Sequence, residues 1–514
     1  MGLLTELFLS RLKLPRDIHR YAFRKYANRV ALRFPDSTVT FAALQERSYR
    51  LVQALEAAGL KTGDSLFAWV ETGPEFFEIR TAALEIGLVL SVFHSQHSPE
   101  FVAFAASKAS PKLMICDPLY ASAAPDLPTW ITGEGYEDQL ASHQPAPSKA
   151  QFSPDLSMGL GFTSGTTGAP KGLLSSHGAA VASLKLIIRN LKVKPDRKVI
   201  NISLPAIPLV GAGSGLIFPS LLSGGEMVVA DVPDAPTLAA LIKAHKITRI
   251  FITPSQLIDL LDLPASADAD LASLTHIIYG TSNMPLPKLE EAIRRFGPIL
   301  QQGYGQAEVL PPVSLLTPEN HMHLGAPAPR DILRSCGRVV KGVSVRIVDD
   351  SGAVLPVGEI GHIHVLTPCR LQSYLDPAQN EGVIFDDGYF KTGDMGFVDK
   401  TGFLTVIDRE ADVINTSEGR IFPRRLEDMA HEHPAVKECC LVAVAGVPKM
   451  VVSLRAGQKN HADLPAEIRA EIEKHAEPWQ IPQEITILSE MPRSFLGKVL
   501  RKNIREDMNH ATAN

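Results

Sequence analysis

The alternation of short strands with helices is the feature of this sequence that most restricts its fold. Apolar runs with strand character at 64–71, 88–94 and 112–117 are separated by segments of helical period at 74–87 and 98–110. Strands joined by crossover helices form parallel sheets that carry helices on their faces. The first part of the chain therefore predicts an α/β fold.

The same alternation returns in the middle of the chain. Helices are expected at residues 237–246, 254–263 and 286–297, and strands at 247–253, 274–280 and 298–305. In such sheets, ligands bind beyond the carboxyl ends of the strands. Two of these strands run out into loops that contain Gly280 and Gly305, so we expect part of a ligand site at this edge.

Shorter strands begin after about Ser335. Alternating apolar and polar residues at 343–352, 358–366 and 402–410, with turn signals between them, predict a compact β subdomain. The sequence therefore adds a mostly-β unit to the α/β part.

The pattern becomes mixed again after Arg409 and includes a helix expected at 464–476. A chain of 514 residues is too long for one ordinary core. We predict a large N-terminal domain over residues 1–408, with stacked αβ subdomains and the β subdomain. A small, mobile α+β domain should follow over residues 409–514.

The composition indicates a globular protein whose partner is a small molecule. Hydrophobic residues make up 45% of the chain, charged residues 21%, and the formal net charge is -5. This balance argues against a nucleic acid or an anionic membrane surface as the main partner. Five cysteines without CxxC spacing favour a reducing cytoplasm, and Glu6 and Arg11 interrupt the apolar run that a signal peptide needs.

Residues 199–225 carry no charge and are numerous enough to span a bilayer. The segment contains Pro205, Pro208, Pro219 and five glycines, so a lipid-exposed helix would leave backbone groups unpaired. We expect buried core beside a pocket here, and no membrane span.

The run TSGTTGAPKG at 163–172 carries the first chemical signal. It consists of Thr163, Ser164, Gly165, Thr166, Thr167 and Gly168, followed by Ala, Pro, Lys171 and Gly. Glycines let backbone N–H groups approach a phosphate, hydroxyls donate further hydrogen bonds, and the lysine adds a mobile charge. A flexible linker is the alternative, but a linker needs no fixed Pro-Lys-Gly ending. The run is neither a Walker A loop nor a dinucleotide fingerprint, and we expect it to cradle a polyphosphate.

Three further segments follow in order: YGQAE at 304–308, YFKTGD at 389–394 and RSFLGK at 493–498. Together with the phosphate loop, they resemble the motifs of the adenylate-forming superfamily. This superfamily includes acyl-CoA synthetases, adenylation domains of nonribosomal peptide synthetases and luciferases. The resemblance covers essentially the whole chain.

The resemblance implies a reaction in which a carboxylate attacks the α-phosphate of ATP, giving acyl-AMP and pyrophosphate. Both reactants are anionic, so cations and hydrogen-bond donors must surround the charge that develops. By resemblance, Lys498 bridges the carboxylate and the α-phosphate, Glu308 holds Mg²⁺, and Lys171 belongs to the phosphate loop. ATP and Mg²⁺ are the implied cofactors.

The resemblance also implies the contacts to the nucleoside. Asp394 should accept hydrogen bonds from both ribose hydroxyls, Arg409 should contact ribose and phosphate, and Tyr304 should offer a flat face to adenine. The other nucleotide-binding residues expected outside the phosphate loop are Gly280, Thr281, Ser282 and Gly305. The alternatives are plain structural roles as turn, surface or core residues.

Two groups of histidines draw attention. His177 matches a histidine that often follows the phosphate loop of the superfamily. The His-Met-His run at 321–323 could suggest a metal site. It has no nearby cysteine or third histidine, so we expect no metal other than Mg²⁺.

The expected acyl pocket is apolar. A domain that activates amino acids would need an Asp near Leu209 to pair the substrate ammonium, and residues 205–219 carry no charge. The pocket residues that we expect are Pro208, Gly211, Gly213, Gly215, Tyr279 and Gly303. The spacing of the glycines resembles benzoate-type aryl-CoA ligases, and the acid is expected to be aromatic, alicyclic or fatty.

The acceptor of the acyl group is the most open part of the prediction. The superfamily implies that the C-terminal domain rotates after adenylation, about a hinge just after Arg409. CoA is the probable co-substrate, but Glu418 stands where relatives commonly have a Gly that lines the pantetheine channel, unless Gly419 takes that place. The alternatives are an amine, as in amide synthetases such as coronafacate ligase, or a carrier-protein thiol. A non-catalytic binding relative is a third possibility, which the presence of Lys498, Glu308 and Asp394 disfavours.

Overall fold

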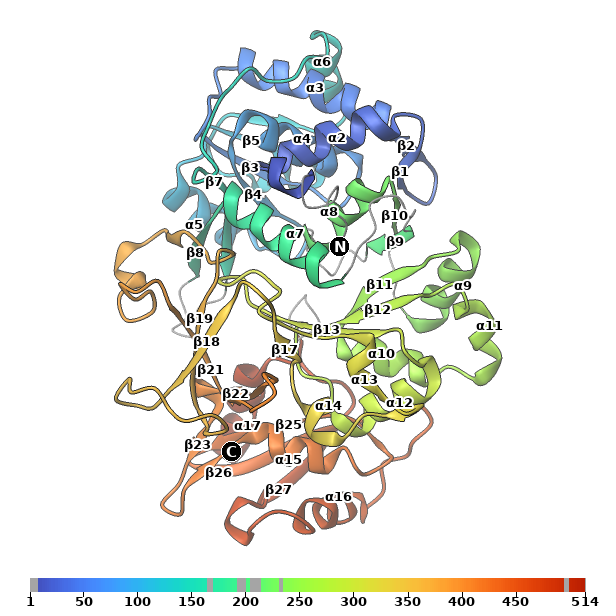
Figure 1. Ribbon diagram of the computed structural model, residues 1–514, viewed down its shortest axis with the longest axis vertical. Helices are drawn as coiled ribbons and strands as arrows, with labels where there is room; N and C mark the ends of the chain where they lie inside the picture. The colour runs from blue at the N-terminus through green and yellow to red at the C-terminus, as the bar shows by residue number, and fades with distance from the viewer. Residues whose placement is uncertain are drawn as a thin grey trace.

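The computed structural model describes residues 8–163, 170–191, 200–203, 214–230, 234–493 and 499–513. Nine expected site residues lie outside these ranges. Five belong to the phosphate loop, three to the acyl pocket, and the last is the expected catalytic lysine: Ser164, Gly165, Thr166, Thr167, Gly168, Pro208, Gly211, Gly213 and Lys498. In Figure 1 the blue, N-terminal elements lie in the upper half of the described structure and the red, C-terminal elements in the lower half.

A seven-stranded sheet forms the core of the upper half, counted over the described residues. Its strands, in spatial order, are β20 (Ser373–Tyr374), β8 (Lys171–Ser176), β7 (Ser157–Thr163), β4 (Val89–Phe93), β3 (Ser65–Trp69), β5 (Leu113–Cys116) and β6 (Thr129–Ile131). The helices of this region are α3 (Phe41–Ala57), α4 (Pro74–Ile86), α5 (Pro99–Ala109), α6 (Glu134–Ala141) and α7 (His177–Leu191). β3 pairs in parallel with both β4 and β5, as the alternation predicted.

A nine-stranded sheet, again counted over the described residues, lies beside it. In spatial order it contains β17 (Arg338–Val339), β14 (Ser314–Leu316), β13 (Leu300–Tyr304), β12 (His276–Tyr279), β11 (Arg249–Ile252), β9 (Ile200–Ser203), β10 (Glu226–Val229), β1 (Val30–Arg33) and β2 (Thr38–Thr40). β11, β12 and β13 are parallel, which confirms the second α/β repeat. The pairing of β1 with β10 was not predicted, because it joins segments almost 200 residues apart.

Helices alternate with the strands of the second repeat. They are α8 (Ser214–Ser223), α9 (Ala235–His245), α10 (Pro254–Leu261), α11 (Asp268–Leu271) and α12 (Leu286–Phe296), with α2 (Pro15–Tyr26) near α8. At α10, the Thr253 hydroxyl accepts from Gln256 N–H and the Gln256 side chain accepts from Thr253 N–H. Such a reciprocal box satisfies donors that a helix start leaves unpaired.

The expected β subdomain is a four-stranded antiparallel sheet in the order β18 (Ser344–Val348), β19 (Gly361–Leu366), β21 (Phe390–Val398) and β22 (Leu404–Arg409). The chain leaves this sheet after β19 and forms β20, which pairs with β8 of the upper sheet. In that pair Tyr374 lies opposite Leu173, so a residue of the β subdomain reaches the strand that follows the phosphate loop.

The C-terminal part is a small α+β unit, as expected. The elements are a hairpin of β23 (Ile414–Asn415) and β24 (Arg420–Ile421), the strands β25 (Val436–Val444), β26 (Val447–Leu454) and β27 (Glu484–Leu488), and the helices α15 (Pro423–Ala430), α16 (Leu464–Glu473) and α17 (Arg501–Ala513). It lies against the second α/β repeat (Figure 1), where Arg455 pairs with Asp262 and Glu291. The predicted α/β class with a small C-terminal domain is confirmed.

All five cysteines are buried and free. In the part of the chain that the structure describes, no helix is both long and apolar enough to cross a membrane.

Candidate active site

The two ends of the phosphate loop are fixed by one antiparallel ladder. β7 enters the loop at Thr163 and β8 leaves it at Lys171, and these two residues are paired. A Cβ added to Gly172 would lie 2.9 Å from the Cβ of Leu375, so only glycine fits beside β20. The ladder therefore fixes the two ends of the loop, Thr163 and Lys171, next to each other.

Tyr374 joins the two charged groups that the sequence assigned to phosphate and Mg²⁺. The Nζ of Lys171 lies 5.4 Å from the centre of the Tyr374 ring, and the Tyr374 hydroxyl donates to Glu308 Oε1 at 3.4 Å. Burial, with the Glu308 carboxylate nearby, raises the pKa of Tyr374. Lys171 and Glu308 thus both contact one aromatic side chain, the lysine at its ring and the glutamate at its hydroxyl.

Asp394 is the most enclosed carboxylate among the expected site residues. It is 4% exposed, and its Oδ2 accepts from the Tyr304 hydroxyl at 2.5 Å and from Gln306 Nε2 at 2.6 Å. Its Oδ1 lies 3.3 Å from Arg409 Nε, on the exposed side. Burial, followed by the nearby Asp394, raises the pKa of Tyr304 well above its usual value, so Tyr304 remains a donor. The structure therefore brings three sequence-predicted nucleotide residues together, with the second oxygen of Asp394 paired to the exposed Arg409 side chain.

The glycines of the strand ends have different surroundings. A Cβ added to Gly305 would meet the backbone of Pro311 at 2.8 Å, so a close backbone approach requires this glycine. A Cβ added to Gly280 would find only ordinary contacts, the nearest being Gly303 O at 3.7 Å. Gly280 and Gly303 thus lie side by side at the ends of β12 and β13, where a flat ligand could approach the backbone.

The loop after β12 has an unusual backbone. Thr281 has a φ of 75°, which residues other than glycine rarely adopt, and its Oγ1 is buried without a hydrogen-bond partner among the described residues. Ser282, the next expected nucleotide residue, is exposed. A buried hydroxyl without a partner suits a loop that closes on a ligand.

The expected acyl-pocket residues are only partly described. Gly215 lies in the first turn of α8. Tyr279 is fully buried, and its hydroxyl is 2.8 Å from His321 Nε2, while His321 Nδ1 lies 2.8 Å from the carbonyl of Thr317. The carbonyl requires Nδ1 to donate, so Nε2 accepts from Tyr279. Burial lowers the pKa of His321 to about 4, which keeps the ring neutral.

Neither histidine position forms a metal site. Across the described residues, no group of three or more His, Cys, Asp or Glu side chains is placed to hold a metal ion. His177 is fully buried and packs against Phe152 with ring centres 4.9 Å apart. Mg²⁺ is usually held by one or two carboxylates together with the phosphates of a nucleotide, so the single carboxylate of Glu308 fits that ion.

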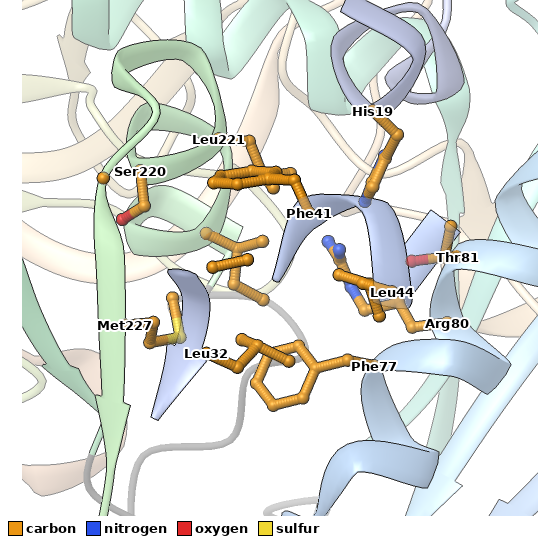
Figure 2. Close-up of a pocket in the computed structure, with 13 residues that line it drawn as sticks. His19, Leu32, Phe41, Leu44, Phe77, Arg80, Thr81, Ser220, Leu221 and Met227 are labelled. Atoms are coloured by element: carbon orange, nitrogen blue, oxygen red, sulfur yellow. The ribbon is translucent and has the colours of Figure 1, made fainter. Parts of the chain in front are cut away.

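A small hollow elsewhere in the N-terminal domain contains none of the expected site residues (Figure 2). Apolar side chains such as Phe41, Phe77 and Leu221 line it, with His19 and Arg80 at one side. Burial lowers the pKa of His19 to about 3. It is not the expected acyl pocket.

The expected acceptor residues lie on the C-terminal hairpin. Glu418 is exposed and accepts a hydrogen bond from the Ser417 hydroxyl, which lowers its pKa. Gly419 has a φ of 149°, and a Cβ there would lie 3.3 Å from the ring of Trp479. Three hydrogen bonds between Thr416 and Gly419 close the turn, so the Glu418 carboxylate is carried on a well-defined hairpin tip.

Two side chains of this site were missed by sequence analysis. Gln306 lies inside the YGQAE motif, between two residues that received roles, so its position could have suggested one. Tyr374 lies in a two-residue strand without a recognised motif. Only its pairing with β8 reveals it.

The comparisons with known proteins agree with this geometry. The AMP-binding enzyme family matches residues 19–375, more than half of the chain, and its C-terminal domain matches residues 425–498. The chain belongs to the AMP-binding enzyme family. The superfamily resemblance is thereby confirmed, together with the expected enzyme class, an AMP-forming acid ligase.

Relatives of this AMP-binding enzyme span almost its full length. A medium/long-chain-fatty-acid–CoA ligase, FadD8 of Mycobacterium tuberculosis, is 30% identical and covers 94% of this chain and 88% of its own. An indoleacetate–CoA ligase of Aromatoleum aromaticum is 27% identical, covering 93% and 95%.

Solved structures share the fold. An anthranilate CoA ligase, AuaEII, in complex with anthranoyl-AMP superposes with a TM-score of 0.87 at 21% identity, covering 98% of this chain and 100% of that one. The amide bond synthetase McbA from Marinactinospora thermotolerans gives 0.83 at 24% identity, covering 96% and 99%. At these identities the likeness shows the fold alone.

Proposed function

We propose that this protein is an ATP- and Mg²⁺-dependent ligase that activates an apolar carboxylic acid as acyl-AMP, releases pyrophosphate and transfers the acyl group to CoA. The observation that carries the proposal is the enclosed cluster of Asp394, Tyr304 and Gln306, with Arg409 at its open side. A buried carboxylate is suited to ribose hydroxyls, which are donors, because the oxygen that pairs with Arg409 can accept a further hydrogen bond.

The chain's own residues divide the adenylation step between them. Lys171 and the loop that precedes it would bind the phosphates, and Arg409 would contact the ribose and a phosphate. Lys498, which lies outside the described residues, would bridge the acid and the α-phosphate. Glu308 would hold Mg²⁺, which when bound neutralises charge on the phosphates. The Tyr374 hydroxyl would orient the Glu308 carboxylate.

Both the sequence and the relatives support a substrate acid with an apolar tail. Residues 205–219 carry no charge, so a charged tail would have no partner there. The curated relatives named above act on fatty and aryl acids, by their names. We therefore place aromatic, alicyclic and fatty acids in the substrate class.

We place the boundary of the C-terminal domain between residues 408 and 409, and this domain would carry the residues that receive the acceptor of the acyl group. Rotation about this point would exchange the Lys498 loop for the hairpin of Glu418 and Gly419. CoA is favoured because the curated relatives named above are CoA ligases. The second candidate is an amine, favoured by the ionised and exposed Glu418 carboxylate, which would repel the phosphates of CoA. The buried, free cysteines support a cytoplasmic location for either reaction.

The test is acid-dependent exchange of labelled pyrophosphate into ATP. Aromatic, alicyclic and fatty acids are screened, and ATP consumption is then measured with CoA, with an amine and with neither. Exchange with at least one apolar acid, and faster turnover with CoA, is expected. Absence of exchange with every acid would favour a binding protein, and faster turnover with the amine would favour an amide synthetase.

A further inference from the structure

The loop between β12 and α12 does not hold its shape through its own residues. Thr281 has a positive φ, and its hydroxyl is buried without a described partner. Helix α12 starts at Leu286, yet its N-cap position is Pro285 and no side chain of the loop caps it. The first N–H groups of a helix need acceptors, so the loop depends on contacts from elsewhere.

Helix α15 of the C-terminal domain supplies those contacts. Arg424 donates from Nη2 to Oδ1 of Asn283, which lies in the middle of the loop. The carboxylate of Asp428, one turn further along α15, lies near the backbone N–H of Leu286; burial raises the pKa of Asp428 to about 6, and the nearby N–H acts in the opposite direction. A carboxylate at a helix N-terminus interacts favourably with the helix dipole, so Asp428 is placed to cap α12 from another domain.

Arg424 is itself fixed to the end of the N-terminal domain. Its Nη1 donates to the carbonyl of Val406 at 2.5 Å, and its backbone N–H donates to Asp408 Oδ2 at 2.8 Å. Both partners lie on β22, immediately before the proposed hinge. One arginine therefore links the hinge strand, α15 and Asn283 of the loop.

Ion pairs hold the C-terminal domain in the orientation that permits these contacts. Arg455 Nη1 lies 3.1 Å from Glu291 Oε2 on α12, and Arg455 also pairs with Asp262 just after α10. Arg330 Nη1 contacts Glu432 Oε1 at 2.9 Å. The Arg455 and Asp262 side chains are each only 17% exposed, so this pair is less screened by solvent than most surface pairs.

We propose that Arg424 and Asp428 are positioning residues that clamp the loop at residues 280–285 while the C-terminal domain is docked. The clamp makes the shape of the nucleotide and acyl wall depend on the orientation of the domain. Rotation would release Asn283 and remove the cap of α12, and the loop would loosen as the products leave. The part of this inference that concerns ligands rests on the proposed function.

Amide hydrogen exchange of the substrate-free protein tests the clamp directly. Arg424→Ala should speed exchange across residues 281–286 by about tenfold, the effect of losing a charge-assisted hydrogen bond. Arg425→Ala is the matched control, because Arg425 is the exposed next residue of α15. It should leave exchange in the loop unchanged. An unchanged rate in Arg424→Ala, with the domain still docked, would overturn the proposal.

Asn283→Ala removes the same hydrogen bond from the loop side and leaves the hinge contacts of Arg424 intact. It should reproduce the faster exchange, and it keeps the test decisive if Arg424→Ala does not fold. Arg424→Lys should give an intermediate rate, because a lysine supplies one donor where the arginine supplies a fork. Identical rates for the lysine and alanine variants would point to a packing role instead.

Pyrophosphate exchange tests the consequence for ligands. In Arg424→Ala, KM for ATP and for the acid should rise several-fold while kcat changes little, because the loop must be ordered on binding. A fall in kcat at unchanged KM would overturn the positioning role. If the wild type catalyses no exchange with any acid, the proposed function fails, whereas the amide-exchange result still decides whether the clamp exists.

Discussion

Replacement of Asp394 by alanine should weaken ATP binding by a defined amount. The Oδ2 oxygen is already used by Tyr304 and Gln306, so the gain from a nucleotide comes from Oδ1. A hydrogen bond to a charged group contributes about 1.5 to 3 kcal/mol. Because the side chain is only 5% exposed, no discount for solvent is needed. The Kd for ATP should rise about 10- to 150-fold, at 1.4 kcal/mol for each factor of ten.

The decisive assay compares ATP with its 2′-deoxy and 3′-deoxy analogues by calorimetry. The wild type should bind at least one analogue more weakly than ATP, and Asp394→Ala should bind ATP and that analogue about equally. Tyr304→Phe is the control for indirect effects, since it removes one donor to Oδ2 and leaves Oδ1 in place. It should retain the preference for ATP.

Two results would refute this reasoning. One is an unchanged ATP affinity in Asp394→Ala. The other is an equal loss of affinity for ATP and for both deoxy analogues, which would mean that the carboxylate supports the fold of the site and does not contact ribose. Thermal unfolding of the same variants separates these cases, because Asp394→Ala leaves the donors of Tyr304 and Gln306 without their acceptor.

Three further outcomes are expected. Lys498→Ala should slow pyrophosphate exchange by about 100-fold or more and still consume pre-made acyl-adenylate, whereas equal loss in both half-reactions would indicate a folding role. Glu418→Gly should raise CoA-dependent turnover and leave pyrophosphate exchange nearly unchanged; no change in either would mean that Gly419 lines the channel. Burial raises the pKa of Asp408 to about 6, so the native state holds its proton more tightly than the unfolded chain and loses stability as pH rises through 6. The unfolding midpoint of Asp408→Asn should therefore rise relative to the wild type between pH 5 and pH 7.5, and a constant difference would contradict the assignment.

Local patterns predicted the fold well where strands and helices follow one another in the chain. The strands at β3, β4 and β5 and the helices α4 and α5 fall within the expected segments, because each has its own periodicity. Neither segment contains a sequence pattern that indicates the pairing of β1 with β10. Long-range pairing depends on complementary surfaces and not on local period, so sequence patterns do not reveal it.

The site shows the same contrast between residues found from local motifs and residues placed by long-range contacts. Asp394, Tyr304 and Arg409 were found from motifs, and the structure brings them together. Tyr374 was missed because its contact with Glu308 arises from a strand that crosses between two sheets. The contacts of α15 with the loop at residues 280–285 were also missed, because they join two domains and neither segment carries a motif that indicates them.

The pairing of β20 with β8 also has a consequence for synthesis of the chain. β20 is the edge strand that covers β8, and it is made about 200 residues after it. Until the ribosome has delivered Tyr374, the strand that leaves the phosphate loop presents an unpaired backbone edge, which is a template for association with other chains. The charged Lys171 at the start of β8 and the helix that follows at His177 leave only a short apolar stretch of that edge uncovered. A nascent chain truncated before β20 should therefore aggregate more readily than one that ends just after it.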